Sequence, residues 1–513
     1  MTAAAQTQVP RAARAAVDRR LLPGTAALAL AAAALLLQLG GTLNHDSAWF
    51  LTATARFLDG ARLYVDIVEL NPPLAFYLTV PPVAAARLLG VASADAFVVY
   101  VFALIAGSLA LSRAIAGTHD RAMPAPRRWI GVIALFALTW LPGAAFGQRE
   151  HLIVVFALPY LVLVAMRASG RAVSPRLAML AGLAGGVAFS IKPPFLIVPV
   201  MLEIYLRLVR GRQGAFFRAE TLVLAAAVSA YALSIFVFTP EYVAFVVPLA
   251  GAVYGAYEAA PAAVLVRLET LLLPVAAAAV VSLRGRYAAP RFAETFLGAG
   301  AAFFALYVAQ MKGWQYQLYP ATAMLMLCAG AMLADAPARA AAFRTASVPA
   351  LLLLILAIDL GARGNYGNAM TNTMLPLVRE HAARGGLAVF SMNLSWGFPL
   401  ATYANADWPS RFPTLWPLPG ILQGRADPKR DQARLDRIER YMIDTTIDDL
   451  ARRPPAAVIV DVREAKDYLG GRPFDYLDYF GRDPRFRALW SGYERVLARP
   501  EFHVYLRRPE SAE

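Results

Sequence analysis

The sequence NHDSAWFLTATARFLDGARLYVDIVELNPPLAFY, residues 44–77, decides how the chain is organised. It follows the first apolar run and closes on Asn71-Pro72-Pro73. Between these limits it places ionisable side chains among aromatic residues: His45, Asp46, Asp59, Asp66 and Glu69. Ionisable groups avoid the hydrocarbon core, so the pattern predicts a polar loop at one face of a membrane, held there by a helical scaffold.

Composition indicates a polytopic α-helical membrane protein. The chain is 58% hydrophobic with a mean hydropathy of +0.50, and 16% of its residues are charged, against roughly a quarter in soluble domains. Apolar runs of about 20 residues recur, the length that crosses the hydrocarbon core. Most of the net charge of +14 lies in short loops between these runs, so no nucleic-acid partner is expected.

The single cysteine and the N-terminal segment narrow the class of protein further. The single cysteine, Cys328, lies inside an apolar run, which predicts a packed thiol and neither a disulfide framework nor a cysteine metal site. Residues 1–20 are basic and polar, and the next run continues as a full span without a small-residue cleavage site. This favours a signal anchor over a cleaved signal peptide.

Arginines in short loops predict the topology, because basic loops stay in the cytoplasm. They gather in six segments: 1–20, 111–128, 167–176, 207–218, 284–291 and 335–344. Arginine-rich loops and arginine-poor loops alternate between the two sides of the membrane only if the apolar run 74–89 does not cross it. This topology has about 11 spans, with the N-terminus inside and residues after 360 outside. The predicted spans are 21–43, 96–116, 129–146, 152–166, 177–191, 194–208, 221–238, 262–283, 292–310, 316–333 and 347–360.

The C-terminal part, residues 361–513, has a soluble composition and predicts a small α/β domain on the outer face. Buried strands are expected at 386–391, 456–461 and 502–506, with an amphipathic helix at 430–449. The segment DWPSRFPTLWP, 407–417, is aromatic and rich in proline. It is interpreted as a surface that stacks on sugar rings, as an interfacial segment, or as a rigid connecting loop.

Lysine is scarce, since only four of the 49 basic residues are lysines. Two of them, Lys192 and Lys312, lie at predicted outer ends of spans. A compact ammonium kept in these places favours binding of a phosphate. The alternative is a lysine that merely extends toward the interface.

Acidic residues of the same face carry two interpretations each. Asp46 is either a functional carboxylate or the N-cap of a helix over 47–58. Glu150 either faces Asp46 across an outer cavity or pairs with its neighbour Arg149. Asp66 and Glu69 either join this cluster or solvate the loop.

A metal site receives little support from the sequence. His45 and His151 lie beside these acids, but no ligand spacing such as HxxxH accompanies them. A divalent cation held by Asp46 and Glu150 remains a weak expectation.

The ordered set of these features resembles the GT-C superfamily of polyprenyl-phosphate-sugar-dependent glycosyltransferases. The features are an Asp after the first span, a first outer loop, and the closing sequence YVDIVELNPPL at 64–74. The similarity is greatest to protein O-mannosyltransferases, to the transferase that adds aminoarabinose to lipid A, and to rhizobial lipopolysaccharide core sugar transferases. It covers about residues 20–360 and implies a juxtamembrane helix at 74–89.

The resemblance implies roles for single residues. The catalytic Asp of the family's first loop corresponds to Asp46, a second acidic residue to Glu150, and the lysine of a Lys-x-Pro-like segment to Lys192. A late Tyr-x-x-x-Pro segment matches the stretch from Tyr316, with Lys312-Gly313-Trp314 ahead of it. Many relatives have Lys-Pro where this chain has Asn71-Pro72, so a phosphate contact of the family is either missing here or supplied by Arg149 or Lys312.

Loop charges and composition divide the chain into a basic cytoplasmic N-terminus (1–20), a transmembrane domain (21–360) and an α/β domain at the outer face (361–513). The resemblance implies that the outer loop 44–90 is catalytic and that the outer face is periplasmic. The implied reaction moves a sugar, with inversion, from a polyprenyl phosphate to a hydroxyl of a lipid, glycan or protein at the outer face of a bacterial inner membrane.

In that reaction Asp46 would be the general base, and Lys192, Lys312 and Arg149 would stabilise the leaving phosphate. Substrate contacts are expected from Asp66, Glu69, Asn71, Trp314 and Tyr316. The sequence has no GxGxxG or GxxxxGK[ST] nucleotide motif. Alternatives are a lipid or sugar transporter, for which inverted repeats and charges at mid-membrane are expected, and a non-catalytic partner in surface polysaccharide assembly.

Overall fold

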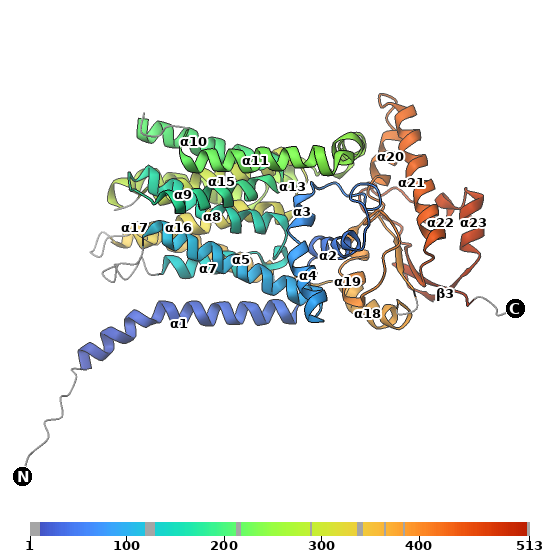
Figure 1. Cartoon of the computed structure of the whole chain (residues 1–513), viewed down its shortest axis with the longest axis horizontal. Coiled ribbons are helices and arrows are strands. Elements are labelled where there is room, and N and C mark those ends of the chain that lie inside the picture. The colour runs from blue at the N-terminus through green and yellow to red at the C-terminus, as the bar shows by residue number, and fades with distance from the viewer. Residues whose placement is uncertain are drawn as a thin grey trace, which may run out of the picture.

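The computed structural model describes residues 11–117, 129–211, 217–287, 290–335, 342–363, 366–382 and 385–509. A bundle of long helices forms one end of the molecule, and a mixed α/β domain forms the other (Figure 1). The helices of the first outer loop lie between the two parts. The predicted fold class, a polytopic helical membrane protein with a small C-terminal α/β domain, is confirmed.

Seven segments of the described residues are long and apolar enough to cross a membrane: Leu22–Gly40, Ser93–Ala116, Arg149–Ala168, Ala219–Phe238, Leu268–Arg286, Pro290–Gln310 and Gln315–Ala334. The remaining predicted spans overlap four further helices: α7 (Ile130–Thr139), α9 (Pro175–Ser190), α10 (Ile197–Arg210) and α17 (Ala342–Arg363). The number of helices that cross stays a prediction.

Helices α8 (Arg149–Ala168) and α16 (Tyr319–Ala334) form the centre of the bundle, because nearly every residue of both is buried. Around them pack α5 (Ser93–Ala116), α14 (Leu268–Leu283) and α15 (Pro290–Gln310). The outer helices α1 (Arg11–Gly40) and α11 (Ala219–Phe238) leave large apolar side chains exposed, as helices that face lipid do. The central position of α8 and α16 fixes the residues at their first turns.

The first outer loop contains α2 (His45–Leu58), α3 (Leu74–Tyr77) and α4 (Val80–Leu89). Asn44 caps α2, since its side chain accepts a hydrogen bond from the Ser47 amide at 2.9 Å. The alternative interpretation of Asp46 as the cap is therefore wrong. Helix α4 has 10 residues and is about 15 Å long, half the thickness of the hydrocarbon core. That the segment 74–89 does not cross the membrane stays a prediction.

A second outer segment follows α11. It consists of short helical turns: η4 (Tyr242–Val246), α12 (Val247–Val253), η5 (Tyr254–Tyr257) and α13 (Pro261–Leu265). Together with η7 (Gln315–Leu318), which leads into α16, it forms the bundle's surface toward the C-terminal domain.

The C-terminal domain contains a four-stranded sheet in the order β1-β2-β4-β3. Strands β1 (Leu387–Phe390) and β2 (Ala457–Asp461) are parallel, and β4 (Phe502–Arg507) runs antiparallel to β2 and to β3 (Tyr493–Ala498). Its helices are α18 (Ala369–Ala382), α19 (Leu400–Ala404), α20 (Leu418–Arg425), α21 (Gln432–Arg452), α22 (Tyr476–Phe480) and α23 (Pro484–Trp490). The three predicted strands and the predicted amphipathic helix are confirmed, and β3 was not predicted.

The aromatic segment 407–417 connects this domain to the first outer loop. The Val68 amide donates to the Arg411 carbonyl at 2.8 Å, and the Trp416 indole donates to the Val68 carbonyl at 3.3 Å. Trp408, Phe412 and Trp416 are buried. These contacts agree with a rigid connector and fix the domain above the loop.

Candidate active site

A cavity of about 500 Å³ lies where the bundle, the first outer loop and the C-terminal domain meet. Its volume is in the range of small-molecule sites, roughly 300–1,000 Å³. Each of the three parts contributes polar or aromatic side chains to its wall, among them Asp46, Trp49, Glu69, Asn71, Gln148, Arg149, Trp314, Tyr316, Asn393, Thr414 and Tyr468.

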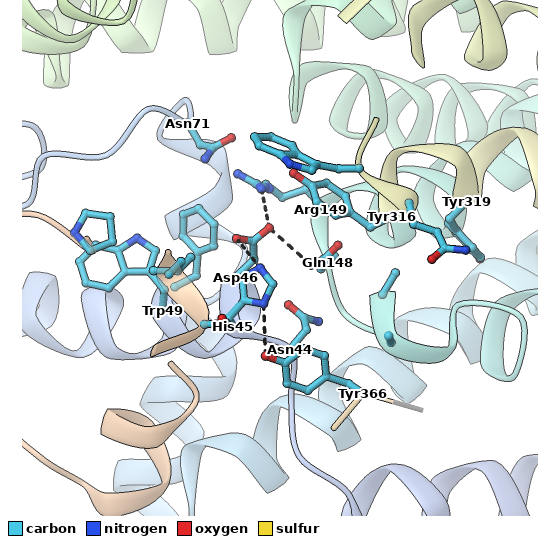
Figure 2. Close-up of a pocket in the computed structure, with 18 of the residues that line it drawn as sticks. Asn44, His45, Asp46, Trp49, Asn71, Gln148, Arg149, Tyr316, Tyr319 and Tyr366 are labelled. Carbon is cyan, nitrogen blue, oxygen red and sulfur yellow. Dashed lines mark hydrogen bonds and ion pairs between the residues drawn. The ribbon is translucent and has the colours of Figure 1, made fainter. Parts of the chain in front are cut away.

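Asp46, in the first turn of α2, presents its carboxylate to this cavity. The carboxylate accepts hydrogen bonds from Arg149 Nη2 at 3.0 Å and from Gln148 Nε2 at 3.4 Å (Figure 2). His45 Nε2 lies 3.9 Å from the other carboxylate oxygen. Two consecutive residues at the start of α8, far from Asp46 in the sequence, therefore orient the Asp46 side chain.

Arg149, the first residue of α8, is almost fully buried, with 8% of its side chain exposed. Its guanidinium lies 5.2 Å above the ring of Phe50. Only Nη2 is bonded to Asp46, and Nε and Nη1 are buried without a hydrogen-bond partner in the described part of the chain. Leaving such donors unpaired costs roughly 1–3 kcal/mol each. A guanidinium offers donors in a planar fork, which matches the oxygens of a phosphate.

Glu69 and Asn71 close the loop at the cavity rim. Trp49 Nε1 donates to Glu69 Oε2 at 2.7 Å, and Asn71 Nδ2 donates to Glu69 Oε1 at 2.6 Å. The Tyr64 hydroxyl donates to the Asn71 carbonyl at 2.7 Å. Burial raises the pKa of the Glu69 carboxyl above its ordinary value. The sequence Asn71-Pro72-Pro73 is thus fixed in place by side chains of its own loop.

The structure separates Glu150 from Asp46. Glu150 is fully buried and accepts a hydrogen bond from Lys192 Nζ, and neither residue lines the cavity. The Lys192 ammonium lies 5.8 Å from the ring centre of Tyr316, which does line it. The Lys192–Glu150 pair therefore lies behind the cavity wall, and the predicted direct roles of both residues stay predictions.

Lys312 and Asp66 also lie outside the cavity lining. Lys312 Nζ donates to the Tyr254 carbonyl at 3.0 Å and lies 4.5 Å from the ring centre of Tyr254. Asp66 accepts from the Arg62 amide at 2.9 Å, within its own loop. Each makes a contact that stabilises an outer segment, and the predicted phosphate and substrate contacts remain predictions.

The two histidines beside the acids have different partners. His45 Nδ1 lies 3.2 Å from the Tyr366 hydroxyl. His151 is buried, accepts from the Gly147 amide at 2.9 Å and donates to the Leu138 carbonyl at 2.7 Å. Within the described residues, no group of three or more His, Cys, Asp and Glu side chains is arranged to hold a metal ion. Asp46 and Glu150 have separate basic partners, so the cation they were expected to share gains no support.

Sequence reasoning did not identify several cavity residues: Gln148, Tyr254, Tyr257, Tyr366, Asn393, Thr414 and Tyr468. The tyrosines of Tyr254-Gly255-Ala256-Tyr257 carried a readable signal, because they lie in a predicted outer segment. No such signal in the sequence marks Tyr468 and Asn393, since they reach the cavity only through the docking of the C-terminal domain.

No family model and no curated protein matches the chain. Among solved structures, ArnT from Cupriavidus metallidurans bound to undecaprenyl phosphate is similar, with a TM-score of 0.53 and 13% identity over 94% of this chain and 97% of that chain. The arabinofuranosyltransferase AftD from Mycobacteria reaches a TM-score of 0.45 with 16% identity, over 95% of this chain and 40% of that one. The likeness to ArnT shows a shared fold along nearly the whole of both chains.

Proposed function

We propose that this chain, which has the fold of ArnT, is a membrane glycosyltransferase that moves a sugar from a polyprenyl-phosphate donor to a hydroxyl of an acceptor. The observation that carries the proposal is the Asp46–Arg149 pair in the cavity. It combines an oriented carboxylate with a buried guanidinium that has two unpaired donors. A base and an anion-binding group side by side are what transfer from a phosphate donor needs.

The donor phosphate would bind Arg149. Nε and Nη1 have no partner in the described part of the chain, and either of them would form a parallel pair with Nη2 once Nη2 turns from Asp46 to a phosphate. ArnT was solved with undecaprenyl phosphate bound, which supports a lipid phosphate as the ligand of this fold. A phosphate at this position would compete with Asp46 for the guanidinium and thereby release the carboxylate.

Asp46 would then act as the general base. The acceptor oxygen attacks the anomeric carbon on the face opposite the phosphate, and its proton passes to Asp46. The new carbon–oxygen bond forms as the bond from the anomeric carbon to the phosphate oxygen breaks, so the configuration inverts. Arg149 stabilises the charge that grows on the departing phosphate, a contribution of a few kcal/mol for one well-placed donor group.

In this proposal the cavity faces the outer, periplasmic side of a bacterial inner membrane. Helix α8 carries Arg149 at its cavity end and Arg167 near the other end, 18 residues and about 27 Å away. Arg210 at the end of α10 and Arg218 before α11 lie in another of the arginine-rich loops, 207–218. Because basic loops mark the cytoplasmic side, the distribution supports an external site, where lipid-linked donors are presented.

A transfer assay tests the proposal. Membranes that contain the wild-type chain are incubated with a panel of radiolabelled polyprenyl-phosphate sugars and native envelope acceptors. Membranes that contain Arg149→Gln serve as the matched control. We expect label to move to an acceptor only with the wild type. Equal transfer by both proteins would contradict the assignment of Arg149.

A further inference from the structure

One wall of the cavity is aromatic and continues from the bundle onto the C-terminal domain. The rings of Tyr316, Trp314, Tyr254, Tyr257 and Tyr468 form this aromatic wall. Adjacent ring centres lie 5.9 Å apart for Trp314 and Tyr316, 6.1 Å for Trp314 and Tyr257, and 4.4 Å for Tyr257 and Tyr468. Tyr254 lies 5.1 Å from Tyr257. The rings are thus a continuous surface along the cavity.

The aromatic wall leads away from the charged centre. Figure 2 shows Tyr316 beside Arg149, the group assigned to the donor phosphate. At its other end the wall reaches Tyr468, which belongs to the C-terminal domain. A polyprenyl tail must stay in the bilayer with the bundle helices, so the Tyr468 end is left for the second substrate.

Polar groups edge this end of the wall. Asn393 and Ser395 follow β1 at the carboxyl end of the parallel pair, where α/β sheets bind ligands. Asn393 Oδ1 accepts from the Ser395 hydroxyl at 2.8 Å, and Asn393 Nδ2 donates to Asp467 at 3.0 Å. Asp467 is fixed in turn by Arg463 at 2.7 Å. The edge is a preorganised pair of amide and hydroxyl groups, and Asp467, which does not line the cavity, holds the amide in place.

Tyr468 is held at this position against its backbone preference. Its φ is +63°, in the left-handed region, which is unfavourable for a residue with a side chain. Gln423 Nε2 donates to its carbonyl at 2.8 Å and stabilises the conformation. Strained residues of this kind gather at functional sites, which supports a role for the presented ring.

We propose that the aromatic wall is the acceptor subsite and that the acceptor is a saccharide; this rests on the proposed function and adds the chemical class of the second substrate. A pyranose has an apolar C–H face that packs on tyrosine and tryptophan rings, and hydroxyls at its edge that bind amide and carboxylate groups. Tyr and Trp offer such rigid amphipathic area at a low entropic cost. A peptide or a lipid head group would make less contact with the faces of the rings.

Saturation-transfer NMR on the full chain in nanodiscs tests this. The probes are maltotetraose, cellotetraose, mannotetraose and a neutral Ser/Thr peptide. We expect saturation to pass from the protein to ring C–H protons of at least one saccharide and not to the peptide. Tyr468→Ala should weaken the binding of that saccharide roughly fivefold, whereas Tyr468→Phe, which keeps the ring, should retain the binding. Tyr100→Ala, on α5 away from the cavity, controls for disturbance of the fold.

Binding of undecaprenyl phosphate is measured on the same samples. Saccharide binding without undecaprenyl phosphate binding would leave the subsite standing and contradict the donor assignment. Undecaprenyl phosphate binding with no saccharide contact would overturn the subsite alone. Peptide contact instead of saccharide contact, or saccharide binding that is unchanged in Tyr468→Ala, would also overturn it.

Discussion

Arg149 Nη2 lies 3.0 Å from Asp46 Oδ2, which joins the first turn of α8 to the first turn of α2. Helix α8 is the buried centre of the bundle, and α2 belongs to the outer loop. The ion pair therefore ties the loop's carboxylate to the most rigid element of the membrane part. It also leaves two guanidinium donors unpaired, and the geometry of those donors leads to the first prediction.

Arg149→Lys should bind undecaprenyl phosphate about tenfold more weakly, although the charge is kept. A lysine is a point charge without the planar fork, so it cannot make two parallel bonds to one phosphate. Microscale thermophoresis in nanodiscs measures the affinity. Arg62→Lys, at a side chain that is 72% exposed, is the control. An unchanged affinity in Arg149→Lys would exclude a bidentate contact.

Substitutions in the Lys192–Glu150 pair should affect the stability of the fold more directly than they affect donor binding. Removal of one partner from a buried ion pair leaves an uncompensated charge and costs about 3–5 kcal/mol. We therefore expect Lys192→Met and Glu150→Gln each to lower the thermal unfolding temperature in detergent. The double variant should recover much of the loss, because no lone charge remains. If Lys192→Met keeps its stability and loses undecaprenyl phosphate binding, the phosphate contact predicted from the sequence is correct.

The sequence could predict that Arg149 and Glu150 lie at the outer end of a span, but not which of them faces the cavity. Consecutive residues of a helix point about 100° apart, since a turn has 3.6 residues. The phase of α8 turns Arg149 toward Asp46 and Glu150 toward Lys192. That phase follows from the packing of the whole bundle, which no local pattern encodes.

Local patterns predicted the fold more fully than the site. Buried strands such as β2 were readable because all five of its residues are apolar or lie at the strand end. Strand β3 escaped because it is an edge strand whose middle residues, such as Glu494 and Arg495, are exposed and charged. The aromatic wall escaped for a different reason, since Tyr468 and Tyr257 are 211 residues apart and meet only after docking.

Gly147→Ala should displace the start of α8. A Cβ at Gly147 would lie 2.4 Å from Phe97 Cε1, and its φ of +75° already disfavours a side chain. We expect a loss of about 1–3 kcal/mol and a loss of donor binding, because Arg149 is two residues away. Gly90→Ala is the matched control, since Gly90 has a φ of +67° and no atom within 4 Å of its Cβ position. Thermal unfolding that is equal in the two variants would contradict a steric role of Phe97.

Glu69 should make stability depend on pH. Its raised pKa means that the folded state keeps a proton which the unfolded chain releases above the ordinary glutamate pKa of about 4.3. Stability then falls as pH rises from about 4.3 through the raised pKa, because the folded state binds more protons in that window. Glu69→Gln lacks this ionisation.

Thermal unfolding of wild type and Glu69→Gln between about pH 4 and pH 8 measures the effect. The advantage of the wild type should be largest at the acidic end and should shrink with rising pH. An advantage that grows with pH would show that the hydrogen bonds from Trp49 and Asn71 outweigh burial and hold the carboxylate ionised.

Transfer by Asp46→Asn tests the central claim most directly. The substitution keeps the size of the side chain and removes the base. Sugar transfer is measured beside undecaprenyl phosphate binding, so that a misfolded variant is recognised. We predict that donor binding persists while transfer falls at least about 100-fold, the usual contribution of a general base. Transfer at the wild-type rate, with binding intact, would contradict the account.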